Sequence, residues 1–214
     1  MPGDALSLPK LYALTDARLS GLTHAEQVAR LCAGGATLVQ LREKHASPLE
    51  FYRAAEAALG VARAHGARLV VNDRADIALA LGADGVHLGQ DDLDPAAARR
   101  LLGPQAIIGY STHGVEQALA AAALPVSYVA IGPVFATATK ENPDPVVGLA
   151  GVRRVRAALP HALPLVAIGG ITHENARAVL QAGADAVAVV GALLAAPGQI
   201  AERTAAFLRR LRTT

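Results

Sequence analysis

The stretch "TLVQLREK" at residues 37–44 leads into "SPLEFYRAAEAALGVARAHG" at residues 47–66. The first segment is short and opens with β-branched and aliphatic residues, which is typical of a strand. The second is long and rich in Ala, begins with Ser47 and Pro48, and ends on Gly66, which are the usual start and stop signals of a helix. Together they predict one β/α unit.

The same unit recurs along the chain. The runs are almost continuously apolar, as expected for parallel strands covered on both faces. The expected strands lie in residues 11–16, 37–44, 68–73, 85–89, 106–111, 128–135, 163–170 and 186–194. The helices expected after them lie in residues 23–35, 47–66, 74–82, 94–103, 113–123, 148–160, 172–183 and 197–211.

Several helix ends carry further signals. Thr23 and Thr172 are N-cap candidates, Thr23 has Glu26 at capping-box spacing, and Pro95 suits a first turn. The glycines expected to end helices are Gly35, Gly66, Gly82 and Gly183.

Eight β/α units in about 200 residues predict an α/β fold, a single (β/α)8 TIM barrel over residues 1–214 with its core at about 10–211. A doubly wound open sheet is the alternative. That fold normally uses fewer strands, and no G-x-G-x-x-G pattern follows the first run. No linker or low-complexity segment divides the chain.

Composition narrows the function. The chain is 52% hydrophobic, carries a net charge of +2 and is 3% aromatic, which argues against a nucleic-acid partner. The single Cys32 excludes an intramolecular disulfide and a cysteine metal cluster. Neither a leader nor an apolar span of 18 residues is visible, so we expect a cytoplasmic protein with no membrane contact.

In such a barrel the chemistry lies at the carboxyl ends of the strands. The expected strand ends carry donors, cations, carboxylates or close-approach glycines, which a set of unrelated solvated loops would not explain. These residues are Thr15, Asp16, Gln40, Arg42, Lys44, Asn72, Asp73, His87, Gln90, Asp91, Asp92, Ser111, His113, Thr137, Thr139, Lys140, Gly169, Gly170, Val190 and Gly191.

The second strand end indicates an anion site. Alternation places Gln40, Arg42 and Lys44 on one face. Leu41 and Glu43 fall on the other. Lys140 would add a third cation, and Arg and Lys are the usual phosphate ligands.

Asp73 and Asp92 follow neighbouring strands and predict a Mg²⁺ site, since two carboxylates with phosphate oxygens and waters suit that ion. Capping of a helix is the alternative role for Asp92. Gly169 and the Val190–Gly191 pair lie where barrels of this kind bind phosphate through backbone N–H groups. Two anions, a diphosphate and a monophosphate, are the simplest ligands for this arrangement.

No nucleophilic dyad is apparent. Ser111 has His113 two residues away without an orienting carboxylate, and Lys44 suits anion binding better than a Schiff base. His87 could face either the barrel interior or the helices. His24, His65 and His161 are expected at the surface.

Motifs in this order resemble the thiamine phosphate synthase family over about residues 11–211. They are "QLREK" (40–44), "VND" (71–73), "GVHLGQDD" (85–92), "GYSTH" (109–113), "GPVFATATK" (132–140), "VAIGGI" (166–171) and "GADAVAVV" (183–190). The resemblance implies a transferase that joins 4-amino-2-methyl-5-hydroxymethylpyrimidine diphosphate to a thiazole monophosphate, releasing pyrophosphate. It also implies Mg²⁺ as cofactor and allows a homodimer.

The resemblance further implies roles for individual residues. Arg42, Lys44, Lys140 and Ser111 would act in catalysis, and Asp73 and Asp92 would hold Mg²⁺. The substrate-binding set would be Gln40, Leu41, Arg42, Glu43, Lys44, Asn72, Ser111, Thr137, Ala138, Thr139, Lys140, Gly169, Val190 and Gly191. Gly191 departs from the family, which often has Ser there, so one phosphate contact is missing.

The implied reaction is dissociative: pyrophosphate leaves, and the thiazole nitrogen attacks the pyrimidine methylene cation. Charge neutralisation of the leaving group then replaces a nucleophile. The loop around residues 137–144 is expected to cover the site. A thiazole tautomerase-like barrel and a non-catalytic phosphate-binding barrel are the alternatives.

Overall fold

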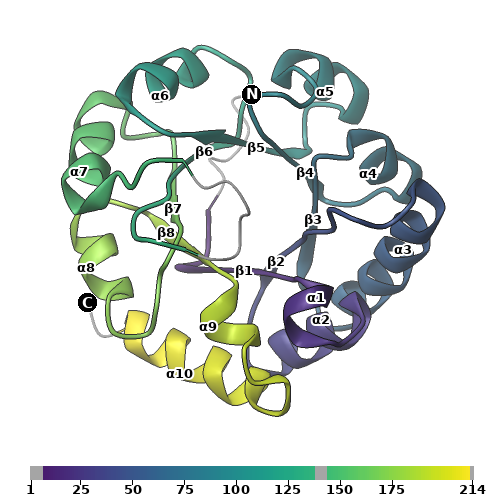
Figure 1. Cartoon of the computed structure of the whole chain (residues 1–214). Coiled ribbons are helices and arrows are strands. Elements are labelled where there is room, and N and C mark those ends of the chain that lie inside the picture. The colour runs from purple at the N-terminus through teal and green to yellow at the C-terminus, as the bar shows by residue number, and fades with distance from the viewer. Residues whose placement is uncertain (1–6, 138–143, 213–214) are drawn as a thin grey trace.

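The computed structural model describes residues 7–137 and 144–212, and within them eight parallel strands pair in chain order into a closed barrel (Figure 1). The strands are β1 (Leu11–Leu14), β2 (Leu38–Leu41), β3 (Arg68–Asn72), β4 (Gly85–Leu88), β5 (Ile107–Thr112), β6 (Tyr128–Ile131), β7 (Leu165–Ile168) and β8 (Ala186–Val189). Leu11 of β1 pairs with Val187 of β8, which closes the ring. The predicted (β/α)8 barrel is confirmed.

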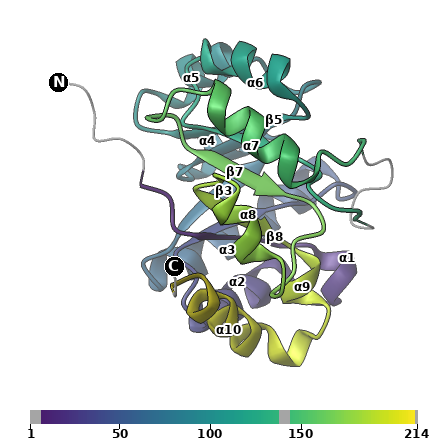
Figure 2. The same ribbon diagram turned by 90° about the vertical axis from the view of Figure 1, so that its left-hand side faces the viewer.

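Helices surround the barrel on all sides, as the end-on and side views agree (Figures 1 and 2). They are α1 (Ala17–Ser20), α2 (His24–Ala33), α3 (Pro48–Ala64), α4 (Ala75–Leu81), α5 (Pro95–Leu102), α6 (Val115–Ala122), α7 (Gly148–Ala158), α8 (Ala176–Gln181), α9 (Gly191–Leu194), the 3₁₀ turn η1 (Pro197–Gln199) and α10 (Ile200–Arg212). Every helix within the described ranges is too short or too polar to cross a lipid bilayer.

The predicted helix ends are mostly confirmed. Thr23 and Ser47 each form a capping box with a glutamate three residues later, and Pro48 and Pro95 sit in first turns. The four glycines expected at helix ends all adopt positive φ, between 60° and 108°. That conformation is nearly free of strain only for glycine.

Three expectations about element boundaries are wrong. The strand expected over 128–135 stops at Ile131. Thr172 does not cap α8, because its backbone N–H donates to Asn175 Oδ1 in a turn that precedes the helix. The strand expected over 186–194 stops at Val189, and residues 191–194 form the short helix α9. An apolar run of this length fits a strand or a helix equally well by periodicity.

Each strand points one side chain toward the mouth of the barrel. This mouth layer consists of Leu14, Gln40, Asn72, His87, Ser111, Ala130, Ile168 and Ala188, one from each strand in turn. Two residues earlier on their strands, Tyr12, Gly85, Gly109 and Tyr128 belong to the layer below. Large rings and glycines share this layer, and a Cβ on Gly109 would lie 2.1 Å from Tyr128 Cζ. The Tyr128 ring fills the interior that Gly109 leaves open, whereas the backbone of Ile107 on β5 takes the space beside Gly85.

Gly85 tests how tightly this layer is packed. A Cβ there would lie 1.9 Å from the Ile107 carbonyl oxygen, so Gly85→Ala should lower the free energy of unfolding by about 3 kcal/mol or more. Gly60→Ala is the matched control, because no atom lies within 4 Å of its added Cβ on α3. It should raise stability by about 0.5–1 kcal/mol. Urea unfolding of both variants decides, and equal effects would contradict the packing argument.

Candidate functional site

A cavity of about 970 Å³ opens at the carboxyl ends of the strands, with the mouth layer as its floor. The predicted site residues that line it are Gln40, Arg42, Lys44, Asn72, Asp73, Asp92, Ser111, Thr137, Gly169, Val190 and Gly191. Ala138, Thr139 and Lys140 lie outside the described residues. Gln40, Arg42 and Lys44 share one face, as alternation predicted.

Leu41 and Glu43 point away from this cavity, so their expected place in the substrate-binding set is not supported. Leu41 is fully buried in the core. Glu43 turns back, and its Oε1 accepts hydrogen bonds from the backbone N–H groups of Lys44, His45 and Ala46 at 2.7–3.2 Å. The glutamate therefore holds the loop that carries Lys44.

A buried histidine anchors that glutamate. His24 Nε2 lies 3.2 Å from Glu43 Oε2, and His24 Nδ1 lies 2.7 Å from Thr15 Oγ1. The Thr15 hydroxyl also accepts from the Arg42 backbone N–H. His24 is 4% exposed, so its expected surface position is wrong, whereas His65 and His161 are exposed. Its place in the first turn of α2, directly after the β1 loop, is the signal that could have located it.

The two described cations are already paired with carboxylates. Arg42 Nη1 donates to Asp16 Oδ2 at 2.9 Å, and Lys44 Nζ donates to Asp73 Oδ2 at 2.5 Å. Arg42 uses one of its five N–H donors in this bond, and Lys44 has three donors. Both cations therefore keep donors for an anion while their carboxylates hold them in place.

Asp73 and Asp92 stand close enough to interact directly. Burial raises the pKa of Asp92, and the neighbouring Asp73 carboxylate raises it further. Asp73 has a φ of 63°, a region that Asp and Asn tolerate better than other side chains. Among the described residues no three His, Cys, Asp or Glu side chains form a metal cluster. Two adjacent carboxylates suit Mg²⁺, which takes one or two carboxylates and completes its shell with phosphate oxygens and water.

The opposite side of the cavity is made of backbone. Gly169 and Gly170 have φ values of 101° and 61°. A Cβ would lie 2.5 Å from Pro133 Cβ at the first and 2.4 Å from the Ala136 carbonyl oxygen at the second. Only glycine fits this close approach. Gly191 opens α9 on the same side, where the first N–H groups of a helix have no intrahelical acceptor. These groups lie where the sequence predicts a monophosphate, and that site stays a prediction.

Ser111 has a histidine partner that its sequence neighbours do not reveal. His87 Nε2 lies 2.9 Å from Ser111 Oγ, and His87 Nδ1 lies 2.8 Å from the Tyr128 hydroxyl. His87 therefore faces the barrel interior. His113 instead contacts the Gly132 carbonyl oxygen and Asp144. Because the third partner is a tyrosine hydroxyl and not a carboxylate, this pair lacks the group that stabilises an imidazolium in a nucleophilic triad.

Comparison with known proteins identifies the family to which the chain is similar. The model of a family described as thiamine monophosphate synthase matches residues 11–193. A thiamine-phosphate synthase of Koribacter versatilis is 49% identical over 96% of this chain and 97% of its own. One of Azorhizobium caulinodans is 50% identical over 87% and 88%. The solved structure of a thiamine phosphate pyrophosphorylase from Pyrococcus furiosus has a TM-score of 0.84 and 36% identity, covering 95% of each chain.

Glu43 should control anion binding although it lies outside the cavity. Glu43→Ala should weaken binding of inorganic pyrophosphate about tenfold, because three backbone N–H groups lose their acceptor and Lys44 loses its fixed position. Glu43→Gln keeps an acceptor oxygen and should recover most of the loss. Calorimetric titration measures both. Glu56→Ala, on the exposed side of α3, is the control, and an equal loss there would contradict the positioning role.

Proposed function

Because the chain belongs to the thiamine monophosphate synthase family, we propose that this cavity joins a pyrimidine diphosphate to a thiazole monophosphate. The product is thiamine monophosphate, and pyrophosphate leaves. The activity is that of a transferase acting on small-molecule substrates. A cytoplasmic location and a homodimer stay predictions.

One observation supports the assignment: two groups of residues of different chemistry line a single cavity. Arg42, Lys44 and the Asp73–Asp92 pair form a charged site. Gly169, Gly170 and the start of α9 form a backbone site on the other side. A diphosphate gains charge as it leaves and needs cations. A monophosphate that stays bound needs only a neutral cradle.

In the proposed reaction the bond between the methylene carbon and the diphosphate oxygen breaks, and its electron pair leaves with pyrophosphate. The lone pair of the thiazole nitrogen then forms the new carbon–nitrogen bond. Arg42 and Lys44 donate hydrogen bonds to the oxygens on which charge develops, and Asn72 lies beside them. Gln40 and Ser111 face the heterocycle from opposite walls. Lys140, with Ala138 and Thr139, keeps its implied role as a prediction.

Asp73 and Asp92 would hold Mg²⁺, and the residues present fit that ion. Their carboxylates are adjacent, and partial burial together with repulsion from Asp73 raises the pKa of Asp92, an effect that a bound cation would offset. When bound, the ion would neutralise charge on the diphosphate. Lys44 is paired with Asp73, so metal and ammonium would share one carboxylate.

The tautomerase-like alternative uses only the thiazole phosphate half of such a cavity. It gives no reason for Arg42, Lys44 and two carboxylates to gather on the other side. The non-catalytic alternative predicts binding without turnover. Assay of thiamine monophosphate formation from the two substrates, with and without Mg²⁺, separates all three.

Arg42→Ala should lower kcat by about 100- to 1000-fold, because the guanidinium stabilises charge that appears as pyrophosphate leaves. Arg42→Lys should recover part of the loss, since a point charge cannot reproduce the planar fork. Steady-state kinetics with the pyrimidine diphosphate measures both. Near-native turnover of the alanine variant would leave Lys44 as the main described cation and sink this role for Arg42.

Asp73→Asn should abolish most Mg²⁺-dependent turnover, by about 100-fold, while the fold stays intact because Asn also tolerates a φ of 63°. Asp94→Asn is the matched control. It removes the same charge from the next loop along the chain, between β4 and α5, and Asn replaces Asp well as the N-cap of α5. Equal losses in the two variants, or full wild-type activity in excess EDTA, would contradict a metal role for Asp73.

Gly191→Ser should strengthen binding of the thiazole monophosphate. A Cβ at this position meets nothing closer than Leu19 Cδ2 at 4.0 Å, so a serine fits and adds one hydroxyl donor to the neutral site. One hydrogen bond is worth about 0.5–1.5 kcal/mol, which lowers KM by roughly 2- to 12-fold. Gly191→Ala adds the same Cβ without the hydroxyl. A KM for Gly191→Ser that matches Gly191→Ala would place the phosphate elsewhere.

A further inference from the structure

A chain of hydrogen bonds crosses the barrel beneath the cavity floor. Gln40 Nε2 lies 3.1 Å from the Tyr12 hydroxyl, and the Tyr12 and Tyr128 hydroxyls lie 3.2 Å apart. His87 joins Tyr128 at 2.8 Å to Ser111 at 2.9 Å. Gln40, His87 and Ser111 line the cavity, whereas the two tyrosines are fully buried below it. The chain therefore links two residues on different walls of the site.

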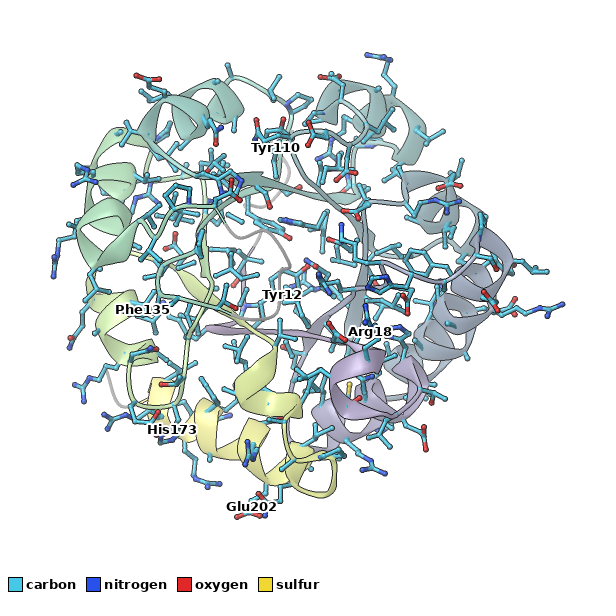
Figure 3. The ribbon with its side chains drawn as sticks, in the orientation of Figure 1. Tyr12, Arg18, Tyr110, Phe135, His173 and Glu202 are labelled. Atoms are coloured by element: carbon cyan, nitrogen blue, oxygen red, sulfur yellow. The ribbon has the colours of Figure 1, made fainter. Side chains whose placement is uncertain are left out.

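The packing around this chain preserves it. The Tyr12 and Tyr128 rings meet edge to face with centroids 5.9 Å apart, and His87 stacks on Tyr128 at 5.6 Å. A Cβ on Gly109 would lie 2.2 Å from the Tyr128 hydroxyl and 2.5 Å from His87 Nδ1. Glycine at this position is what allows the tyrosine and the histidine to meet. Figure 3 shows Tyr12 inside the ring of strands and Tyr110 out at its rim.

The number of hydrogen atoms available to this hydrogen-bond chain restricts the direction in which its members donate. The His87 ring is buried and its two nitrogens contact only the hydroxyls of Tyr128 and Ser111, so the ring is neutral and carries one N–H. The two hydroxyls and the ring supply three hydrogens for four hydrogen bonds. The fourth must come from one end, from the Gln40 amide or from the Ser111 hydroxyl. Any other arrangement leaves a buried donor or acceptor unpaired, which costs about 1–3 kcal/mol.

We propose that Tyr12, Tyr128 and His87 are positioning residues that couple Gln40 to Ser111, so that one presents a donor to the cavity when the other presents an acceptor. If Ser111 donates into the chain, its lone pairs face the cavity and Gln40 uses Oε1 inside, which leaves Nε2 outside as a donor. If Gln40 donates into the chain, Oε1 faces the cavity and the Ser111 hydrogen is free to donate.

This pairing suits one class of ligand: a planar heterocycle with a ring nitrogen acceptor on one edge and an exocyclic amino donor on the opposite edge. The choice of the aminopyrimidine as that ligand rests on the proposed function, whereas the coupling itself does not. A ring with two donors or two acceptors leaves one wall mismatched in either direction of the chain. The hydrogen-bond chain would therefore disfavour binding of such rings.

The first test needs no turnover. Gln40→Glu supplies only an acceptor to Tyr12 when ionised and should favour the His87 tautomer with the hydrogen on Nδ1. Gln40→Met supplies neither donor nor acceptor. It should favour the His87 tautomer with the hydrogen on Nε2, because leaving an acceptor on Tyr12 unpaired costs less free energy than leaving a donor unpaired. Nitrogen-15 NMR of the His87 ring in the ligand-free protein at pH 7 measures the tautomer ratio. Loss of packing alone would not shift this ratio in opposite directions in the two variants.

Tyr12→Phe keeps the ring but cuts the chain, so in that background Gln40→Glu and Gln40→Met should give the same His87 ratio. Tyr110→Phe is the matched control, because Tyr110 lies on β5 outside the chain, and there the difference between the two Gln40 variants should persist. The same ratio in both Gln40 variants without Tyr12→Phe, a doubly protonated wild-type ring, or a difference that survives Tyr12→Phe would overturn the coupling.

The second test uses turnover. The effects of Gln40→Met and Ser111→Ala on kcat/KM should be non-additive by about tenfold, as expected for residues in one network, and should become additive in the Tyr12→Phe background. Non-additivity that persists with Tyr12→Phe would place the coupling in the ligand and overturn the chain. Absence of synthase turnover in the wild type would refute the proposed function alone, since the NMR comparison stands without it.

Discussion

The Tyr128 ring occupies the space that any side chain at Gly109 would need, and much of the packing inside the barrel depends on this close contact. A closed ring of eight strands must fill its centre with side chains from alternating strands. Here a tyrosine from β6 crosses toward β4 and β5, and Tyr12 from β1 meets it edge to face. The hydroxyls that come with these rings could not stay unpaired in such a place. Filling the core with tyrosine thus requires a polar chain that ends at the cavity.

In the charged half of the cavity the polar groups also have partners, and here those groups are ions. Arg42 and Lys44 converge on one wall, and each has a carboxylate partner, Asp16 and Asp73. Behind them Glu43 is held by His24, so the loop is fixed by groups that never face the ligand. Paired cations lose little freedom when an anion arrives, because their side chains are already ordered. The glycine half reaches the same rigidity through backbone conformations that exclude any other residue.

The sequence predicted the barrel and most strand ends, because apolar runs, caps and glycines are local signals. It predicted the wall of Gln40, Arg42 and Lys44 through alternation alone. It placed His24 at the surface and paired Ser111 with no histidine but His113, and both errors have one cause. The partners Glu43 and His87 lie 19 and 24 residues away along the chain, and the packing of neighbouring β/α units brings them into contact. Periodicity describes which face a residue occupies and contains no information about its partner on a neighbouring element.

The lack of an activated nucleophile among the described residues of the cavity and the presence of a polar hydrogen-bond chain have a common explanation. A reaction that begins with departure of an anion needs its leaving group neutralised and its ring held in one orientation. The cations and the carboxylate pair serve the first need at one wall. Gln40 and Ser111 serve the second, and they can do so only if their hydrogens are set together, since a ring turned over would present its donor to a donor. His87 and the fully buried Tyr12 and Tyr128 connect these two residues beneath the cavity floor. In this barrel the packed core is therefore also part of the recognition of the ligand.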